Sequence, residues 1–135
     1  MLLVDTNVLV DVLENDPKWA DWSISQLRAQ AKIHQLAINS IIYAELSLTF
    51  STVELLDRSI DDLRLSLIEL PRPALFLAGK AFARYRGRGG TKSNVLSDFF
   101  IGAHAAVSRY PLLTRDTQRY TAYFSEINLI SPNLT

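Results

Sequence analysis

The feature that most limits the fold of this chain is the alternation of short apolar runs with longer segments of helical pattern. Most of the runs are continuously apolar, which is typical of strands buried on both faces of a parallel sheet. We predict strands at residues 2–4, 36–39, 66–70, 112–114 and 127–130. Strands and helices that alternate in this way indicate an α/β fold, with a mainly parallel central sheet flanked by helices in a three-layer sandwich.

Capping residues and prolines set the ends of the predicted helices. Thr6 and Ser40 are suitable N-cap residues, and proline is favoured in the first turn of a helix, as at Pro17. Ser51 and Glu54 have the spacing of a capping box. The expected helices span residues 6–14, 16–33, 40–50, 51–65, 73–85 and 97–108, with a short one before the last strand. The glycine-rich stretch GRGGTKSN (87–94) is expected to form a loop.

The composition is that of an ordinary globular protein and excludes several classes. The chain has 135 residues, 48% hydrophobic and 21% charged, which suits one domain over residues 1–135. It contains no cysteine, so a disulfide framework and a thiolate zinc site are excluded. We see no secretory leader and no apolar run long enough to span a bilayer, and therefore expect a cytoplasmic protein with no membrane partner.

Acidic side chains lie near the predicted strands where a parallel sheet binds its ligands. Asp5 directly follows the first strand, Glu45 lies in the helix after the second, and Asp98 and Asp116 lie before and after the fourth. Ligands of open parallel sheets bind beyond the carboxyl ends of the strands. We therefore expect these four carboxylates to reach one edge of the sheet.

Glu45 gives the strongest indication of a metal ion. Ile41, Ile42 and Leu48 place it on an apolar helix face, where an unpaired carboxylate is costly to bury. No basic residue lies at helical spacing from it within the helix. A divalent cation shared with the other acids would compensate the charge, and a distant arginine such as Arg84 is the alternative. Ligands that offer only oxygen favour Mg²⁺ or Mn²⁺ over zinc.

The charge distribution indicates what such a metal site acts on. The net charge is zero, but between Arg72 and Arg119 nine basic residues stand against two acids. A basic field attracts polyanions, and carboxylates around metal ions beneath such a surface suit a phosphodiester. The metal would lower the pKa of a bound water and neutralise charge on the phosphate, so that hydrolysis needs no covalent intermediate.

The four acids lie in the segments VDTNVL (4–9), YAEL (43–46), LSDFFIGAHA (96–105) and LLTRDTQRY (112–120). In this order and context the segments resemble the acidic motifs of PIN-domain ribonucleases, specifically the VapC-type toxins of bacterial toxin–antitoxin pairs. The resemblance spans nearly the full chain. It implies a PIN-like α/β fold and a Mg²⁺- or Mn²⁺-dependent endoribonuclease.

The resemblance also implies roles for individual residues. Those that would bind metal are Asp5, Glu45, Asp98 and, directly or through water, Asp116. Those that would hold these ligands or a water in place are Thr6, Asn7 and Thr114. Many relatives have an acid or amide three residues after Asp116, where this chain has Arg119. This departure bears on whether a second metal is bound permanently.

Partners follow from the same resemblance. Such toxins cleave RNA, are usually dimers, and are held inactive by a cognate antitoxin whose C-terminal segment lies along the groove leading to the acids. An antitoxin arginine or lysine often enters the site, since carboxylates pair readily with a guanidinium. In this chain, Arg86, Arg88 and Lys92 are expected to hold RNA phosphates by charge. A solvated basic surface is the other interpretation of that loop.

Each motif also has a simpler structural interpretation. Residues 5–7 would be a capped turn, Asp98 would complement a helix dipole, and Asp116 would be a turn residue. His104 is expected to be structural. Trp19 and Trp22 are expected to pack between helices, with a contact to an antitoxin or a second copy as the alternative.

Three other functions are open on the sequence alone. A phosphohydrolase would use Asp5 as its nucleophile, but Asn7 stands where that chemistry needs a second aspartate. A receiver-like signalling module would have paired acids after the first strand and a lysine after the last, which this sequence lacks. A PIN scaffold would bind RNA or a partner without cutting.

Overall fold

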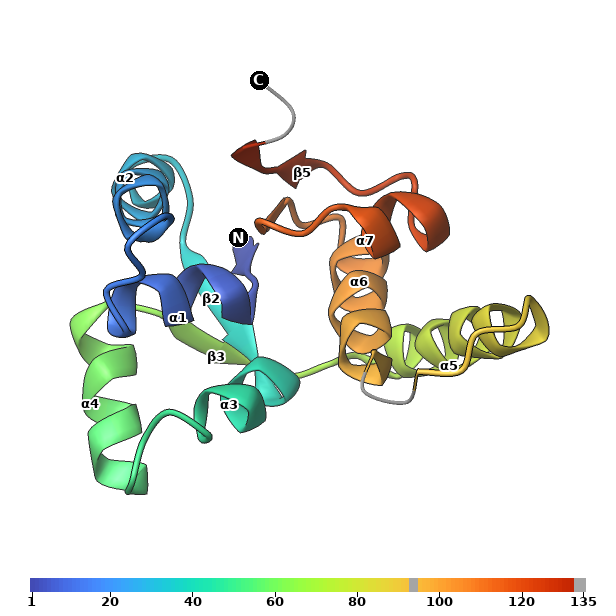
Figure 1. The fold of residues 1–135 in the computed structure, drawn as a ribbon, viewed down its shortest axis with the longest axis horizontal. Helices are drawn as coiled ribbons and strands as arrows, with labels where there is room; N and C mark the ends of the chain where they lie inside the picture. Colours follow the sequence, from blue (N-terminus) through green and yellow to red (C-terminus); the bar gives the residue numbers. More distant parts are fainter. Residues whose placement is uncertain (93–94, 133–135) are drawn as a thin grey trace.

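The computed structural model describes residues 1–92 and 95–132 (Figure 1). The strands are β1 (Leu2–Val4), β2 (Leu36–Asn39), β3 (Ser66–Ile68), β4 (Leu112–Leu113) and β5 (Leu129–Ile130). The helices are α1 (Thr6–Leu13), α2 (Ala20–Ala31), α3 (Ser40–Leu46), α4 (Val53–Asp62), α5 (Arg72–Gly87), α6 (Leu96–Ser108) and α7 (Gln118–Tyr123). The predicted alternation of strands and helices is confirmed.

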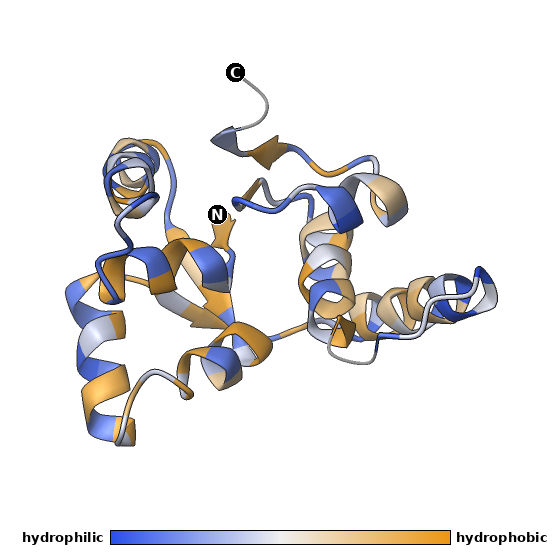
Figure 2. Ribbon diagram, viewed as in Figure 1, coloured by the Kyte–Doolittle hydropathy of each residue, from blue (hydrophilic) through white to orange (hydrophobic). Residues whose placement is uncertain are grey.

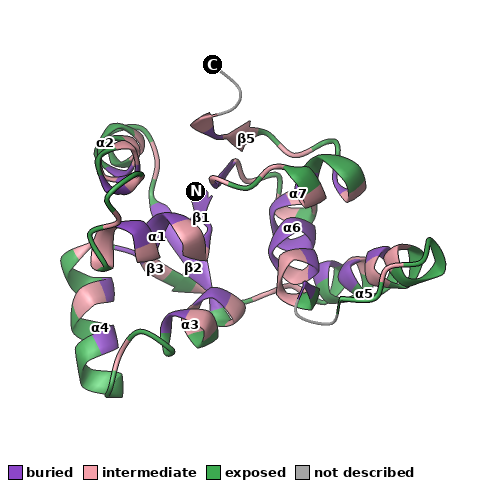
Figure 3. Ribbon diagram, viewed as in Figure 1, coloured by how far each residue is buried: buried purple, intermediate pink, exposed green. Residues whose placement is uncertain are grey.

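The strands form one sheet in the order β3-β2-β1-β4-β5, and all four pairings between them are parallel. Leu3 in the central strand pairs with Ala37 of β2 on one side and with Leu112 of β4 on the other. Every residue of β1, β2 and β4 is buried (Figure 3). The continuous apolar runs are therefore inner strands covered on both faces, as predicted.

Helices cover both faces of the sheet. Parallel crossovers are right-handed, so the path from β1 through β2 to β3 places α1, α2 and α4 on one face. The return to β4 and β5 places α5, α6 and α7 on the other (Figure 1). The strand order thus reverses between β1 and β4, and α3 contacts both α1 and α6 at the carboxyl end of the sheet. This reversal is the usual ligand site of open α/β sheets.

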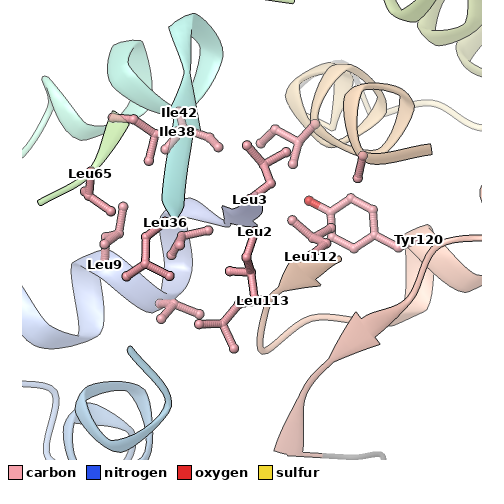
Figure 4. Packing of buried hydrophobic residues seen from close by; sticks show 14 of the residues in the cluster. Leu2, Leu3, Leu9, Leu36, Ile38, Ile42, Leu65, Leu112, Leu113 and Tyr120 are labelled. Atoms are coloured by element: carbon pink, nitrogen blue, oxygen red, sulfur yellow. The ribbon is translucent and has the colours of Figure 1, made fainter. Parts of the chain in front are cut away.

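The hydrophobic core fills both sides of the sheet. Leu9 and Leu65 pack on the side of α1, whereas Leu112 and Tyr120 lie on the side of α6 (Figure 4). Apolar residues follow the inner strands, while the far end of α5 is hydrophilic (Figure 2). In the part of the chain that the structure describes, none of the helices combines the length and apolar character needed to cross a membrane.

The second helix begins at Ala20, so the prediction of a start at Asp16 was wrong. The carboxylate of Asp16 accepts the N–H groups of Lys18 and Trp19, each at 2.9 Å. The backbone carbonyl of Asp16 accepts the N–H of Ala20 at 3.0 Å. Residues 16–19 therefore form a turn, stabilised by an aspartate that competes for the backbone donors a helix would use.

The third helix ends at Leu46 and not at Phe50, and α4 is capped by Thr52 and not by Ser51. The Thr52 hydroxyl accepts the N–H of Leu55 at 3.2 Å. Leu48, between the two helices, is 90% exposed. The apolar helix face predicted for Glu45 is therefore interrupted, because Leu48 lies outside the helix.

Other ends differ by a few residues. β3, β4 and β5 are shorter than predicted, while α5 is longer and runs from Arg72 to Gly87. Proline stands in the first turn of α5, where it needs no hydrogen-bond donor. Of the loop predicted at 87–94, residues 93 and 94 lie outside the described residues.

Gly102 allows α6 to approach the rings of Tyr120 and Phe124. A Cβ at this position would lie 2.5 Å from Phe124 Cδ2 and 3.1 Å from Tyr120 Cδ1. Both rings are buried, and overpacking a core commonly costs about 1 to 3 kcal/mol. We expect Gly102→Ala to lower the free energy of unfolding by about this amount, measured by urea denaturation.

The matched control is Gly79→Ala in α5, where a Cβ would meet nothing within 4 Å. Alanine is the better helix former by about 1 kcal/mol, so this variant should be as stable as the parent or more so. A Gly102→Ala protein with the stability of the parent would contradict the close packing of α6.

Candidate functional site

Four acids surround one cavity at the carboxyl ends of β1 and β4. The cavity has a volume of about 320 Å³ and is lined by Asp5, Thr6, Asn7, Val10, Glu45, Asp98, Arg115 and Asp116. Asp5 caps α1 directly after β1, and Asp116 follows β4. Glu45 lies on α3 and Asp98 in the first turn of α6. The sheet topology thus brings together acids from both ends of the chain.

Asp5 is 4% exposed and both of its oxygens accept hydrogen bonds. Oδ1 accepts the backbone N–H of Thr6 at 2.8 Å. Oδ2 accepts the hydroxyls of Thr114 and Tyr120, each at 2.8 Å. Burial raises the pKa of Asp5 to about 6, although these hydrogen bonds act in the opposite direction. Oδ1, with a single donor, is the oxygen more available to a ligand.

Asn7 and Thr114 hold the loop after β4 against α1. The buried Thr114 hydroxyl oxygen accepts the N–H of Asp116 at 3.1 Å and the side-chain amide of Asn7 at 3.3 Å. The Asn7 carbonyl oxygen in turn accepts the N–H of Arg115 at 3.1 Å. These contacts fix the backbone of the exposed Asp116 relative to Asp5.

Glu45 is half-buried and is held by two hydroxyl groups. Thr6 Oγ1 donates to Oε1 at 2.6 Å, and Ser97 Oγ donates to Oε2 at 3.1 Å. Within residues 1–92 and 95–132, no cation lies at ion-pair distance from Glu45, so Arg84 is not its partner there. Ser97 lies in the first turn of α6, whose N-cap residue is Val95.

Asp98 faces the other acids and one arginine. Its side chain is 29% exposed, and its Oδ2 lies 3.6 Å from Nη1 of Arg119. Burial raises the pKa of Asp98 to about 7, helped by the charges of Asp5, Asp116 and Glu45 and opposed by Arg119. The four carboxylates therefore act on one another electrostatically.

Arg115 lines the cavity, but its charge is already neutralised. Its Nε and Nη2 donate to the two oxygens of Asp11, which is 2% exposed and also accepts the hydroxyl of Ser23 at 2.8 Å. The guanidinium lies 5.1 Å from the ring centroid of Trp19, which makes an edge contact with Trp22. Both tryptophans thus have packing contacts within the chain.

His104 has a structural environment away from the acids. It is buried, and its Nδ1 lies 3.0 Å from the side-chain nitrogen of Asn39. The Asn39 oxygen accepts the N–H groups of Ile41 and Ile42 at the start of α3. The amide nitrogen must then donate to His104, whose Nδ1 is therefore unprotonated. Burial lowers the pKa of this ring, which favours the neutral form.

The basic residues predicted to contact RNA lie outside the acid cavity. Arg86 and Arg88 are exposed. The Arg86 guanidinium lies 5.8 Å from the ring centroid of Phe82, and that of Arg88 lies 5.5 Å from the ring centroid of Tyr123. The exposed Lys92 donates its backbone N–H to the Tyr85 hydroxyl at 3.1 Å. An aromatic cluster that includes Tyr85 and Tyr123 thus joins the end of α5 and the loop after it to α6 and α7.

The donor set around the cavity suits a hard divalent cation. It offers carboxylate oxygens, and oxygen ligands of this kind are preferred by Mg²⁺ and Mn²⁺. As the side chains stand, no three acidic or histidine residues of the described chain converge on one metal position. Glu45 is directed at two hydroxyls and Asp98 at Arg119. Metal binding would therefore need rotation of these side chains.

Sequence reasoning missed two hydroxyls of the site, those of Ser97 and Tyr120. Ser97 directly precedes Asp98, and its local pattern is that of a helix cap. Tyr120 ends the LLTRDTQRY segment, which was the available signal. Neither partner was predictable locally, since Glu45 and Asp5 are distant in the chain.

Asp5 and Asp98 should make the metal-free protein less stable as the pH rises. Their pKa values in the folded state are about 6 and about 7, against an ordinary 3.8. The folded protein then binds more protons than the unfolded chain, and this stabilisation is lost as the pH passes through the folded values. We expect the melting temperature in EDTA to fall between pH 5 and pH 8.

The control for this pH dependence is Asp98→Asn, an uncharged isostere. It should melt higher than the parent at pH 8, by roughly 4 °C for each kcal/mol gained in a domain of this size, and should show a smaller fall. Comparing the two proteins cancels other groups such as His104, whose lowered pKa acts in the opposite direction. An equal fall in both would contradict the assignment to Asp98.

Tyr120→Phe removes one hydroxyl and keeps the buried ring. Asp5 then loses a donor that lowers its pKa, so the loss should be larger when Asp5 is ionised. We expect a destabilisation of about 1.5 to 3 kcal/mol at pH 8, the range for hydrogen bonds to charged groups, and a smaller one at pH 5. Urea denaturation at the two pH values measures both.

Tyr123→Phe in the same helix is the matched control, because Tyr123 is half-buried and its hydroxyl makes no hydrogen bond within the described residues. It should change stability little at either pH. Equal losses for Tyr120→Phe at pH 5 and pH 8 would mean that the hydroxyl does not act on the Asp5 charge.

Comparisons with known proteins agree with this geometry. The sequence profile of the PIN domain matches residues 2–125. Among solved structures, VapBC2 from Rickettsia felis bound to a promoter DNA fragment is 24% identical, with a TM-score of 0.73 over 96% of this chain and 97% of that one. A toxin–antitoxin complex from Klebsiella pneumoniae is 22% identical, with a TM-score of 0.69 over 98% of both chains.

VapBC-1 from nontypeable Haemophilus influenzae is 19% identical, with a TM-score of 0.71 over 96% of both chains. At these identities the solved structures show a common fold. A search of curated protein sequences finds no match. Because the family profile covers nearly the whole chain, the chain belongs to the PIN domain family.

Proposed function

We propose that this chain is a metal-dependent endoribonuclease toxin of the VapC type, which hydrolyses RNA phosphodiester bonds. The observation that carries the proposal is the meeting of four carboxylates in one cavity of a PIN fold. The solved structures of similar fold are toxin–antitoxin complexes, which supports neutralisation by a cognate antitoxin.

In this proposal Asp5, Glu45 and Asp98 hold Mg²⁺ or Mn²⁺, and Asp116 completes the set directly or through water. Bound metal would supply a water of lowered pKa and neutralise charge on the phosphate. The protein supplies position: Thr114 and Tyr120 fix Oδ2 of Asp5, so that its Oδ1 faces the ligand. Thr6 and Ser97 orient Glu45 in the same way.

The proposal assigns phosphate binding to Arg86, Arg88 and Lys92. Their exposure suits contacts that depend on charge and not on base identity. The aromatic cluster between this loop and α6 places them on the same side of the sheet as Asp98. RNA that contacts the loop would then pass toward the acids.

Two protein partners are part of the proposal, a cognate antitoxin and a second copy of the chain. Exposed apolar side chains support protein contacts in two places. One group lies after α3 and in the first turn of α4, and the other lies along β3 and α5; they are Leu48, Val53 and Leu55, and Leu67, Leu75 and Phe76. A toxin that acts on cellular RNA would work in the cytoplasm.

The test is RNA cleavage by purified protein freed of any antitoxin. We expect cleavage with Mg²⁺ or Mn²⁺ and none after addition of EDTA. Asp5→Asn and Asp98→Asn should each lower the rate by about 100-fold or more, since each removes a charged group that positions the metal. The control is Asp21→Asn, which removes an exposed acid on α2 and should cleave at the parental rate.

Different outcomes separate the alternatives. Unchanged cleavage by both site variants would refute the proposed centre. Metal-stimulated phosphate release from a small ester, with RNA intact, would favour a phosphohydrolase. RNA that is bound but not cut would favour a scaffold. Replacing Arg86, Arg88 and Lys92 together by glutamine should weaken RNA binding and its salt dependence, and unchanged binding would leave this loop a solvated surface.

A further inference from the structure

Arg119 places a positive charge beside the acid cavity. Its Nη1 lies 3.6 Å from Oδ2 of Asp98, and the two side chains are 22% and 29% exposed. Arg119 belongs to α7 and Asp98 to α6. Over residues 1–92 and 95–132 this is the one ion pair made by the four acids of the cavity. Oδ2 of Asp98, a potential metal ligand, is therefore already paired with a cation.

A second contact holds Arg119 independently of Asp98. Its guanidinium lies 5.3 Å from the ring centroid of Tyr85 on α5. That ring is fixed by contacts with Phe99 at 5.6 Å and Tyr123 at 6.3 Å between ring centroids. A cation over an aromatic face is attracted by the negative charge on the face of the ring. Arg119 can thus stay at the edge of the cavity when Asp98 is taken by another cation.

The charge balance of the cavity gives this pair its consequence. Arg115, the arginine that lines the cavity, is bound through two nitrogens to the buried Asp11 and is not available. Arg119 is the cation whose charge acts on Asp98 and opposes the effect of the neighbouring carboxylates. A divalent cation bound to Asp98 would also offset the charge of these carboxylates. Its positive charge would then lie close to that of Arg119, and the two would repel each other.

We propose that Arg119 and the divalent cation exchange at Asp98, so that the Arg119–Asp98 ion pair must open before metal binds and lowers the affinity of the site for metal. The proposal rests on the metal-dependent function proposed above. It accounts for the side-chain arrangement, in which Asp98 is directed at Arg119 and no three acids among the described residues converge. Arg119 is thus a positioning residue that sets the metal concentration at which the site is filled.

The experiment measures the affinity of the full chain for Mn²⁺ alone, by isothermal titration calorimetry. Arg119→Gln should bind Mn²⁺ about fivefold more tightly than the parent. This is the change in affinity expected if the lost ion pair is at the upper end of the usual strength of partly exposed pairs. Arg119→Lys, which keeps the charge, should stay close to the parent. The control is Arg84→Gln, which removes an exposed charge from α5, the helix that carries Tyr85, and should leave the affinity unchanged.

A second measurement follows Arg119 itself. Its side-chain Nε–H signal in the NMR spectrum should shift when Mg²⁺ is added to the parent, as the ion pair opens. Equal Mn²⁺ affinities for the parent and Arg119→Gln, or an Arg119 signal that Mg²⁺ does not move, would overturn the exchange and leave the proposed function standing. Absence of Mn²⁺ binding in every variant would overturn both.

Discussion

The repulsion between four carboxylates in one small cavity is the constraint on which the rest of the site depends. Charges of like sign a few ångströms apart cannot be buried without compensation. The protein compensates locally, with hydroxyl donors on Asp5 and Glu45 and a guanidinium on Asp98. The compensation is incomplete, because the pKa values of Asp5 and Asp98 are still raised to about 6 and about 7. Such a site gains by taking up protons or cations.

The topology of the sheet explains why this cost falls on one place. The strand order reverses between β1 and β4, so α1 and α6 approach the carboxyl end of the central strand from opposite faces. Tyr120 shows how closely core and site are joined there. Its ring packs beside Gly102 in the core, and its hydroxyl donates to Asp5. A change in the packing of α6 against α7 is therefore also a change in the orientation of a metal-binding candidate.

The sequence predicted the architecture because the apolar runs are local and continuous. It predicted which acids line the cavity because each follows a strand or lies in a helix that connects two strands. It did not predict the partners. Glu45 was selected as the acid that needs compensation, but one stated reason was wrong, since Leu48 is 90% exposed, and its partners are Thr6 and Ser97. The pairing of Asp11 with Arg115 likewise joins residues from opposite ends of the chain. Contacts of this kind depend on the completed fold and leave no periodic signal.

Arg115 and Arg119 lie four residues apart and have opposite roles in the charge balance. Arg115 is held by two hydrogen bonds to a carboxylate that is 2% exposed, and separating such a pair would leave a buried charge without a partner. Arg119 makes a single contact at 3.6 Å to a carboxylate that is 29% exposed, and it has the Tyr85 ring as a second partner. Opening the second pair therefore costs much less than opening the first. Arg115 is therefore a fixed part of the framework, whereas the ion pair of Arg119 with Asp98 is the one that can open at low cost.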